Sequence, residues 1–262
     1  DLVRSRGLGD VYKRQVSWED YADRSREVCE QLRESDDPRD RSRCALAEAL
    51  HHFYTTPAPE LDTPLTELPL LAVDVETTGL DADRDRLLSV GMVAINGRAI
   101  PLATADHWLV RYHEGDVSVG QSATIHGITD SQLENGRSLL DILTDVVNAA
   151  AGRALLAHLA LIEHDFISTA CERAVGVPWS PLRVVDTMDL ERRSAVSFGR
   201  RPGRGEVRLM NARYSCGLPS YHNHNALVDA LACAELYLAQ TSADHFGSEL
   251  ESVIRKKGTT RW

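Results

Sequence analysis

The stretch Val73–Leu80, with the sequence VDVETTGL, decides the fold, and it continues an apolar run that begins at Leu68. Such a run, broken only by Pro69, predicts a buried β-strand. Side chains alternate between the two faces of a strand, so we expect Asp74 and Glu76 on the same face. Two neighbouring carboxylates at the end of a buried strand repel each other and resist the loss of water. The stretch therefore indicates a divalent cation held by oxygen ligands, Mg²⁺ or Mn²⁺, with two acids at an exposed sheet rim as the alternative.

The composition is that of an ordinary globular chain of 262 residues, with 43% hydrophobic and 26% charged residues. No apolar run approaches the roughly 18 residues of a membrane span, so we expect a soluble protein. The formal net charge of −10 argues against sequence-independent coating of duplex DNA, although a local basic patch can still hold a strand end. The five cysteines contain no CxxC pair, so we expect neither a disulfide framework nor structural zinc, and a reducing cytoplasm fits best.

The chain divides into five predicted segments. Residues 1–15 are expected to be an artefact, because SRGLGDVYKRQ resembles a translated sequencing adapter, and they are excluded from the fold. Residues 16–54 have helical periodicity with a break at Asp36-Asp37-Pro38, which predicts a helical extension that packs on its own domain or binds a partner. Residues 55–67 are proline-rich and predict a stiff linker. The main domain is expected over residues 68–241, followed by a polar tail, residues 242–262, that frays.

The order of elements in the main domain predicts a mixed α/β sheet. The apolar segment Leu87–Ile95 predicts a second strand, and Asn96-Gly97 predicts a two-residue hairpin turn before a return strand from Arg98 to Val110. Helices are expected from about 138 to 150, 162 to 175 and 226 to 240, alternating with short strands near 154–157 and 184–185. Three antiparallel strands and then two parallel strands, flanked by helices, form the expected sheet.

Further acids are needed if two metal ions bind, because four positive charges must be balanced. Glu163 shares a helical stripe with Phe166, Ile167 and Ala170, so we expect its carboxylate to face inward. Asp165 lies on the other side of that helix and is the fallback ligand. For both acids the alternative is a first-turn carboxylate that complements the helix dipole.

The last predicted helix contains a second buried acid. Asp229 lies in Ala226–Gln240, which is apolar nearly all round, so we expect its carboxylate to be paired or metal-bound. His224 precedes it by five residues, and a histidine titrates near enough to neutral pH to accept a proton from water. The alternative for His224 is a surface or capping group.

Three separated motifs resemble one known family. They are Asp74-x-Glu76-Thr77-Thr78-Gly79, His158 with an acid five residues later, and His224-x-Ala226-x-x-Asp229. In this order and spacing they are similar to the DEDDh 3′–5′ exonucleases, and more closely to the bacterial DNA polymerase III epsilon-like (DnaQ-like) exonucleases, over about residues 68–240. The resemblance implies a ribonuclease H-like fold and two divalent cations, Mg²⁺ or Mn²⁺, at Asp74, Glu76, Glu163 and Asp229. It also implies that His224 is the general base in hydrolysis of a terminal phosphodiester, with release of a nucleoside 5′-monophosphate.

The second motif departs from the family pattern His-Asn-x-x-Phe-Asp, because the chain has HLALIE from His158 to Glu163. The longer glutamate puts the rate and the metal preference in question. The resemblance also suggests contacts to the terminal nucleotide from Thr77, Thr78, Gly79 and Leu80, while His126 and His158 either flank the same pocket or are structural.

The segment from Arg183 to Arg213 contains eight arginines and four acids. Its loop Gly199–Gly205 either clamps the backbone of a strand through Arg200, Arg201 and Arg204 or is simply solvated. Together these observations predict a metal-dependent 3′–5′ exonuclease acting on single-stranded DNA or a frayed primer end, with a DNA polymerase as a partner to test. Two alternatives stay open: an exoribonuclease that trims RNA ends, and a catalytically weak, polymerase-associated nucleic-acid-binding module.

Overall fold

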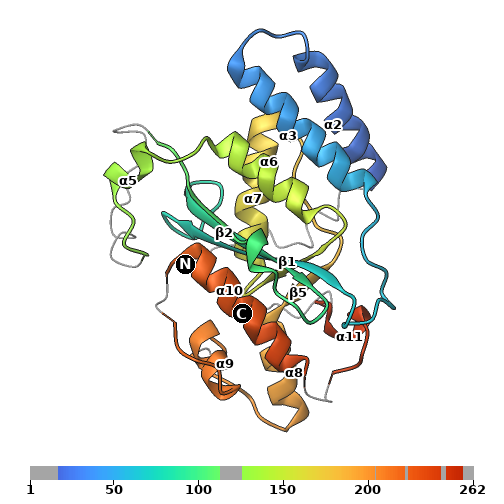
Figure 1. The fold of residues 1–262 in the computed structure, drawn as a ribbon, viewed down its shortest axis with the longest axis vertical. Helices are drawn as coiled ribbons and strands as arrows, with labels where there is room; N and C mark the ends of the chain where they lie inside the picture. The colour runs from blue at the N-terminus through green and yellow to red at the C-terminus, as the bar shows by residue number, and fades with distance from the viewer. Residues whose placement is uncertain (1–16, 113–125, 204, 222–223, 243–245, 256–262) are drawn as a thin grey trace.

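The computed structural model describes residues 17–112, 126–203, 205–221, 224–242 and 246–255. The described part of the chain is built around a five-stranded sheet with the strand order β3-β2-β1-β4-β5 (Figure 1). The strands are β1 (Pro69–Thr77), β2 (Leu87–Asn96), β3 (Asp106–Leu109), β4 (Ala154–Ala157) and β5 (Val184–Asp186). β2 is antiparallel to β1 and to β3, whereas β4 is parallel to β1 and to β5. The predicted mixed sheet, three antiparallel strands followed by two parallel ones, is confirmed.

The two faces of the sheet are covered by different helices, and the alternation along β1 decides which side chains meet them. Leu71, Val73 and Val75 pack with α6 (Leu139–Ala150) and α7 (Leu161–Val175) in one core. Leu70 and Ala72 pack with α10 (Ala226–Gln240) and the C-terminal segment in a second core. Since Asp74 and Glu76 share the parity of Leu70 and Ala72, they belong to the α10 face.

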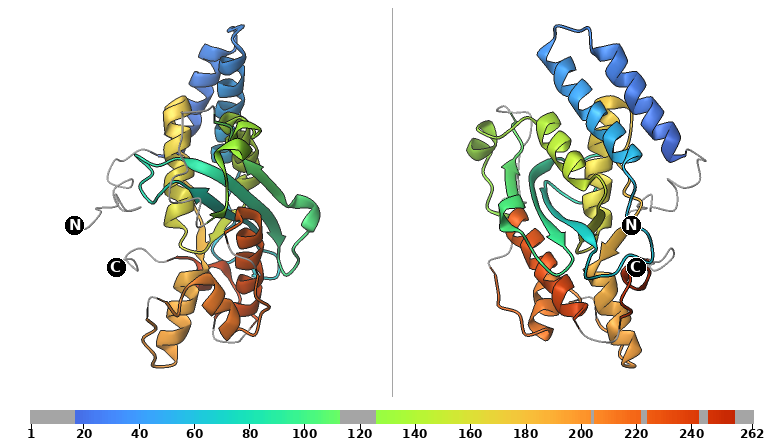
Figure 2. Two further views of the ribbon diagram at one scale, coloured as in Figure 1. Left: turned by 90° about the vertical axis from the view of Figure 1, so that its left-hand side faces the viewer. Right: turned by 45° about the vertical axis from the view of Figure 1, so that its right-hand side comes forward.

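The N-terminal helices α2 (Trp18–Leu32) and α3 (Pro38–Thr55) form one end of the molecule, and α8 (Thr187–Ser197) and α9 (Leu209–Ser215) lie at the other (Figures 1 and 2). Ser17 and Asp20 form the capping box that starts α2, and the Asp37 side chain caps α3. Leu46, Leu50 and other apolar residues of α3 enter the core shared with α6 and α7. The helical extension therefore packs on its own domain. No helix among the described residues is both long and apolar enough to cross a membrane.

One expectation about the cysteines is wrong. Cys29 of α2 and Cys44 of α3 form a disulfide, with their Cα atoms 4.4 Å apart. The pair is separated by 15 residues, so no local spacing motif reveals it. Only the antiparallel packing of the two helices brings the cysteines together.

Two further expectations need correction. The hairpin turn is shifted by one residue, because Asn96 and Ala99 exchange backbone hydrogen bonds around Gly97-Arg98. The return segment is not a continuous strand: a 3₁₀ turn, η1 (Leu102–Thr104), interrupts it before β3.

The tail does not fray between residues 246 and 255. α11 (Leu250–Val253) buries Leu250 and Val253 completely, and Ile254 forms a β-bridge with Val185. The proline-rich connection also packs here, since Pro64 bridges to Glu249. The remaining short helix, α5 (Asp130–Glu134), follows the end of β3. The proline-rich connection and the C-terminal segment thus bury apolar side chains next to each other, which their polar composition does not predict.

Candidate active site

The carboxyl-terminal half of β1 supplies the first two acids. β1 runs on to Thr77, so Asp74 and Glu76 lie within the strand rather than beyond its end. Asp74 pairs with Gly91 of β2, and Glu76 pairs with Ser89. Their backbones are therefore held by the sheet, and their side chains are presented rigidly on the α10 face.

Gly91 allows α10 to approach these acids. A Cβ atom built on Gly91 would lie 2.1 Å from the backbone nitrogen of Leu227 and 2.2 Å from the carbonyl carbon of Ala226. Backbone atoms this close cannot be pushed aside as a flexible side chain can. Glycine opposite Asp74 thus lets the first turn of α10 rest directly on the sheet, and it brings Asp229 next to the acids of β1.

The start of α10 places a histidine beside these acids. The side chain of Asn225 caps the helix, and His224 before it has a left-handed φ of +69°. The backbone N–H of His224 donates to Oδ2 of Asp229 at 2.8 Å. Side-chain ligand atoms of Glu76, His224 and Asp229 lie within 4.8 Å of one another. The exposed imidazole and two carboxylates therefore face one point.

α7 brings the fourth acid and separates its two candidate ligands. Glu163 is 4% exposed, whereas Asp165 accepts a hydrogen bond from Nδ1 of the buried His164 at 2.9 Å and has a side chain 32% exposed. The carboxylate of Glu163 lies close enough to Asp74 for its charge to raise the pKa of Asp74. Glu163 is thus the α7 carboxylate that joins the cluster, and Asp165 pairs with His164 instead.

The electrostatics of the cluster follow from this crowding. Burial raises the pKa of Asp74 well above its usual value, and the charges of Glu163, Asp229 and Glu76 raise it further. Burial and the charge of Asp229 raise the pKa of Glu76 to about 7. Burial is also the main cause of the raised pKa values of Glu163 and Asp229. Four acids that oppose one another's ionisation are unfavourable to hold together unless positive charge joins them.

Two buried oxygens indicate where that positive charge fits. Oε2 of Glu163 and Oδ1 of Asp229 have no hydrogen-bond partner among the described residues. Burying a carboxylate oxygen without a hydrogen-bond donor costs on the order of several kcal/mol, as does burying an unpaired charge. Because the cluster offers oxygen ligands, a hard divalent cation such as Mg²⁺ or Mn²⁺ suits these atoms. We will call Asp74, Glu76, Glu163 and Asp229 the acid cluster.

Sequence reasoning overlooks Asp186, which ends β5. Its carboxylate accepts backbone N–H groups of Leu159 and Ala160 at 3.1 Å each and of Met188 at 2.9 Å, and it caps α8. Its charge also contributes to the raised pKa of Glu163. Asp186 therefore ties the loop before α7 to the start of α8 and fixes where Glu163 enters. The available signal is an acid at the end of the apolar strand Val184-Val185, the same pattern as in β1.

Leu159 occupies the position where the family pattern has asparagine. Its φ is +78°, in the left-handed region that asparagine adopts far more readily than leucine. Its N–H is held by Asp186, and its carbonyl accepts the N–H of Ile162 at 3.1 Å. The backbone of Leu159 thus makes a left-handed turn although its side chain does not favour one.

The predicted substrate residues of the β1–β2 loop lie beside the acid cluster. The Thr77 hydroxyl donates to the carbonyl of Gly79, and the Thr78 hydroxyl donates to Oδ1 of Asp85 at 3.1 Å. The Asp85 carboxylate packs so closely on Gly79 that a Cβ there would lie 2.4 Å from its Oδ2. Leu80 is 79% exposed, so its side chain is available to a ligand.

The two candidate flanking histidines have different surroundings. Burial lowers the pKa of His126, and the nearby His224 lowers it further, so His126 stands on the His224 side of the cluster. Burial lowers the pKa of His158 to about 4, and its Nδ1 lies 2.8 Å from Oγ1 of Thr187. His158 therefore packs against the start of α8.

The basic segment is partly structural. Arg213 is 1% exposed and pairs with Glu235 at 2.9 Å, which anchors α9 to α10. Arg200 forms an exposed ion pair with Glu206 at 3.4 Å, while Arg204 lies outside the described residues. The part of the segment that remains exposed around Arg200 and Arg201 is the part available to a strand.

Comparison with known proteins identifies the class. The exonuclease family profile RNase_T matches residues 71–237, and the chain belongs to this exonuclease family. The epsilon subunit of DNA polymerase III from Treponema pallidum (strain Nichols) is 33% identical over 168 residues, which cover 63% of this chain and 73% of that protein. The expected kinship with the epsilon-like exonucleases is thereby confirmed.

Two other matches show how far the likeness extends. The PolC-type DNA polymerase III of Thermotoga maritima (strain ATCC 43589 / DSM 3109 / JCM 10099 / NBRC 100826 / MSB8) is 27% identical over 177 residues, 68% of this chain but only 12% of that enzyme. The nuclease domain of 3′hExo, a DEDDh family member solved with bound rAMP, superposes with a TM-score of 0.57 at 13% identity, covering 72% of this chain and 96% of that one. The likeness to 3′hExo concerns the fold, and it confirms the ribonuclease H-like architecture.

Proposed function

We propose that the protein is a metal-dependent 3′–5′ exonuclease that removes nucleoside 5′-monophosphates from the end of single-stranded DNA. The observation that carries this proposal is the acid cluster: four carboxylates from β1, α7 and α10 converge, and buried oxygens of Glu163 and Asp229 lack partners. A binding module gains nothing from such a cluster, because carboxylates repel the phosphates of a strand.

The chain's own residues divide the chemistry between them. Asp74, Glu76, Glu163 and Asp229 would hold two divalent cations, which would supply stabilisation of the attacking and leaving oxygens when bound. His224 acts as the general base and takes the proton of the attacking water at its exposed imidazole. Asp229 accepts a hydrogen bond from the backbone N–H of His224 and so positions the loop that carries the base. Leu80, exposed beside the cluster, packs against the terminal base.

The preference for DNA, the 3′ end and a polymerase partner rests on kinship. Relatives of the matched segment include an epsilon subunit of DNA polymerase III and a PolC-type polymerase. We therefore propose that the chain works in the cytoplasm on frayed primer ends, in proofreading or repair, and that a DNA polymerase is its partner.

Hydrolysis of RNA ends is the second candidate, because the DEDDh neighbour 3′hExo was solved with a bound ribonucleotide, rAMP. One assay separates the candidates. The full chain is incubated with 5′-labelled DNA and RNA oligonucleotides, with Mg²⁺, Mn²⁺ or EDTA. We expect a ladder that shortens from the 3′ end of DNA, only with metal. Faster loss of RNA would favour the exoribonuclease, and an intact label in every lane would leave only a binding module.

The His224→Ala variant tests the base. Proton transfer by a positioned side chain contributes about 10²- to 10⁴-fold, so we expect kcat to fall in this range while calorimetry shows metal binding largely unchanged. His164→Ala offers a contrast, because the His164 imidazole is buried and hydrogen-bonded to Asp165. A wild-type rate for His224→Ala would exclude it as the base.

A further inference from the structure

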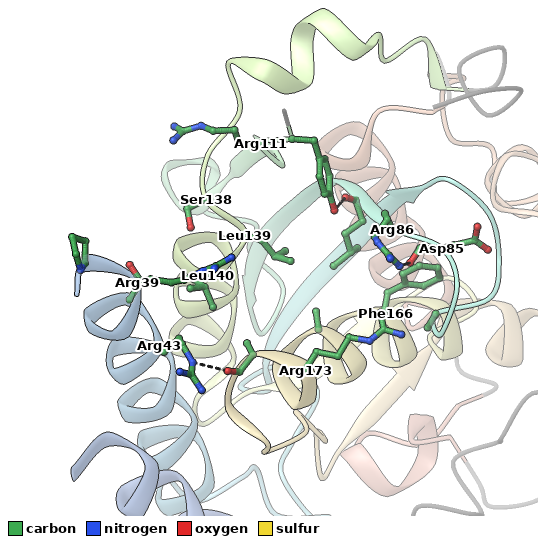
Figure 3. A pocket seen from close by; sticks show the side chains of 17 residues that line it. Arg39, Arg43, Asp85, Arg86, Arg111, Ser138, Leu139, Leu140, Phe166 and Arg173 are labelled. Atoms are coloured by element: carbon green, nitrogen blue, oxygen red, sulfur yellow. Dashed lines mark hydrogen bonds between the residues drawn. The ribbon is translucent and has the colours of Figure 1, made fainter. Parts of the chain in front are cut away.

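A cleft of about 940 Å³ opens beyond the β1–β2 loop, away from the acid cluster. Side chains from α3, the β1–β2 loop, the segment after β3, the start of α6 and the outer half of α7 line it, and Figure 3 shows how they surround it. Five of them are arginines: Arg39, Arg43, Arg86, Arg111 and Arg173. We will call this site the arginine cleft. Five guanidinium groups in one cleft are unexpected in a chain with a formal net charge of −10.

The cleft contains little compensating charge. Among the described residues, Asp85 is the only acid in its lining, and its carboxylate accepts hydrogen bonds from the Thr78 hydroxyl and the N–H of Asp81. Arg43 pairs with Asp40 at 3.1 Å, and Arg173 reaches Asp83 at 3.8 Å.

The other three arginines have no carboxylate within ion-pair distance among the described residues. Arg86 donates to the carbonyls of Arg84 and Asp85, and Arg111 donates to the carbonyl of Gly136. Arg39 is exposed at the first turn of α3. Unpaired guanidinium groups gathered in a cleft attract anions, and phosphates above all, because the guanidinium fork matches phosphate oxygens.

Two elements join the cleft to the acid cluster. On α7, Glu163 belongs to the cluster, and Phe166, Ala170 and Arg173 line the cleft in succession. Ten residues of helix span about 15 Å at about 1.5 Å per residue, which is roughly four nucleotides at about 3.4 Å each. The β1–β2 loop likewise presents Thr77–Leu80 to the cluster and Arg86 to the cleft.

We propose that the arginine cleft binds the phosphodiester backbone of the strand that leads away from the terminal nucleotide, a few nucleotides from the cleaved bond. Leu139 and Leu140, both half-buried in the lining, give bases an apolar surface, which suits a single strand with exposed base faces. The inference rests on the proposed exonuclease function. It assigns α3 of the helical extension a role in holding substrate.

The test uses the full chain and a readout that needs no catalysis. Arg39→Ala/Arg86→Ala is compared with Arg33→Ala/Arg84→Ala, which removes the same charge from neighbouring positions outside the cleft. Binding of fluorescent dT4 and dT16 is measured by anisotropy in EDTA across a salt series. Loss of two phosphate contacts lowers the salt slope by about 1.4, since single strands lose about 0.7 per contact. We expect this change, and at least a tenfold weaker affinity for dT16, only in the cleft variant.

Activity separates this inference from the proposed function. With Mg²⁺, the p-nitrophenyl ester of thymidine 5′-monophosphate probes the acid cluster alone, because it has no strand to enter the cleft. The cleft variant should hydrolyse this ester at the wild-type rate but show at least a tenfold higher KM for dT16. Equal slopes in both double variants, or a wild-type chain that binds poly-glutamate as tightly as dT16, would overturn the cleft assignment. If the wild-type protein hydrolysed neither the ester nor the oligonucleotide, the proposed function would be overturned instead.

Discussion

The acid cluster and the arginine cleft share α7 and the β1–β2 loop, but they differ in the sign of their charges and in how deeply those charges are buried. In the cluster, the carboxylates are buried or half-buried, and burial together with the charges of neighbouring acids raises the pKa values of Asp74 and Glu76. In the cleft, Arg39, Arg86 and Arg111 are exposed to solvent, which screens their charge. Charge that is buried without a partner needs a tightly bound ion, whereas exposed charge suits an exchangeable polyanion.

The largest expected effect comes from substituting the two α7 acids separately, because Glu163 belongs to the acid cluster and Asp165 does not. Glu163→Gln removes a charge from the cluster, and losing several kcal/mol of metal-derived stabilisation lowers kcat by about 10³-fold or more. Asp165→Asn should retain activity within a few-fold, because Asp165 pairs with His164. Steady-state rates with Mg²⁺ and Mn²⁺ check both variants. The reverse result would make Asp165 the ligand.

Gly91→Ala tests whether the close approach of α10 assembles the cluster. The added methyl group would meet the backbone of Ala226 and Leu227, so α10 must move away from the sheet. We expect a loss of about 1–3 kcal/mol of stability, typical of overpacking, together with weakened metal binding. Chemical denaturation and calorimetry measure the two effects. Gly205→Ala is the control, since no atom lies within 4 Å of a Cβ built there. Wild-type metal affinity in Gly91→Ala would show that the helix position is not critical.

The pH dependence of stability distinguishes the two charged sites without substrate. Folding raises the pKa of Glu76 from 4.5 to about 7, so the folded chain binds more protons than the unfolded chain between these values. The associated stability is complete below about pH 4.5 and is lost as pH rises through about 7. In EDTA, Glu76→Gln should therefore melt progressively higher than wild type as pH rises from 5 to 8, by roughly 3 °C or more at pH 8.

The same melting series has two internal checks. Mg²⁺ should raise the wild-type Tm more at pH 8 than at pH 5, because metal binding competes with protons on the carboxylates. Arg39→Ala should follow the wild-type pH trend, since it leaves the carboxylates of the acid cluster unchanged. A constant Tm difference between Glu76→Gln and wild type would remove the electrostatic argument.

The smallest effect concerns the turn that delivers Glu163. Leu159 has a left-handed backbone, which costs a non-glycine residue about 1–2 kcal/mol and suits asparagine better. Leu159→Asn should stabilise the protein by about 1 kcal/mol, or roughly 2–4 °C in Tm. Leu159→Ala is the matched control, because it also removes the leucine side chain but keeps an unfavourable residue in the same conformation. An equal change in both variants would point to the lost side chain.

Local pattern was sufficient to predict most of the elements. The bounds Ala154–Ala157 and Ala226–Gln240 agree with the structure, because a nearly unbroken apolar run marks a buried element and its length separates a strand from a helix. The parity of Asp74 and Glu76 and the stripe containing Glu163 follow from the same periodicities. The return strand was mispredicted because η1 closes on local hydrogen bonds after Pro101, and the C-terminal segment was mispredicted because Leu250 is buried by residues far away in the sequence.

The sequence by itself determined which acids the strands and helices present, because side-chain direction follows from a repeat of two or 3.6 residues. Tertiary structure alone decided that those acids meet, that Gly91 must lie under α10, that Asp186 holds the loop before α7, and that arginines from four separate parts of the chain form one cleft. Such juxtapositions arise from packing between segments far apart in the chain, and packing leaves no periodic trace in any one of them.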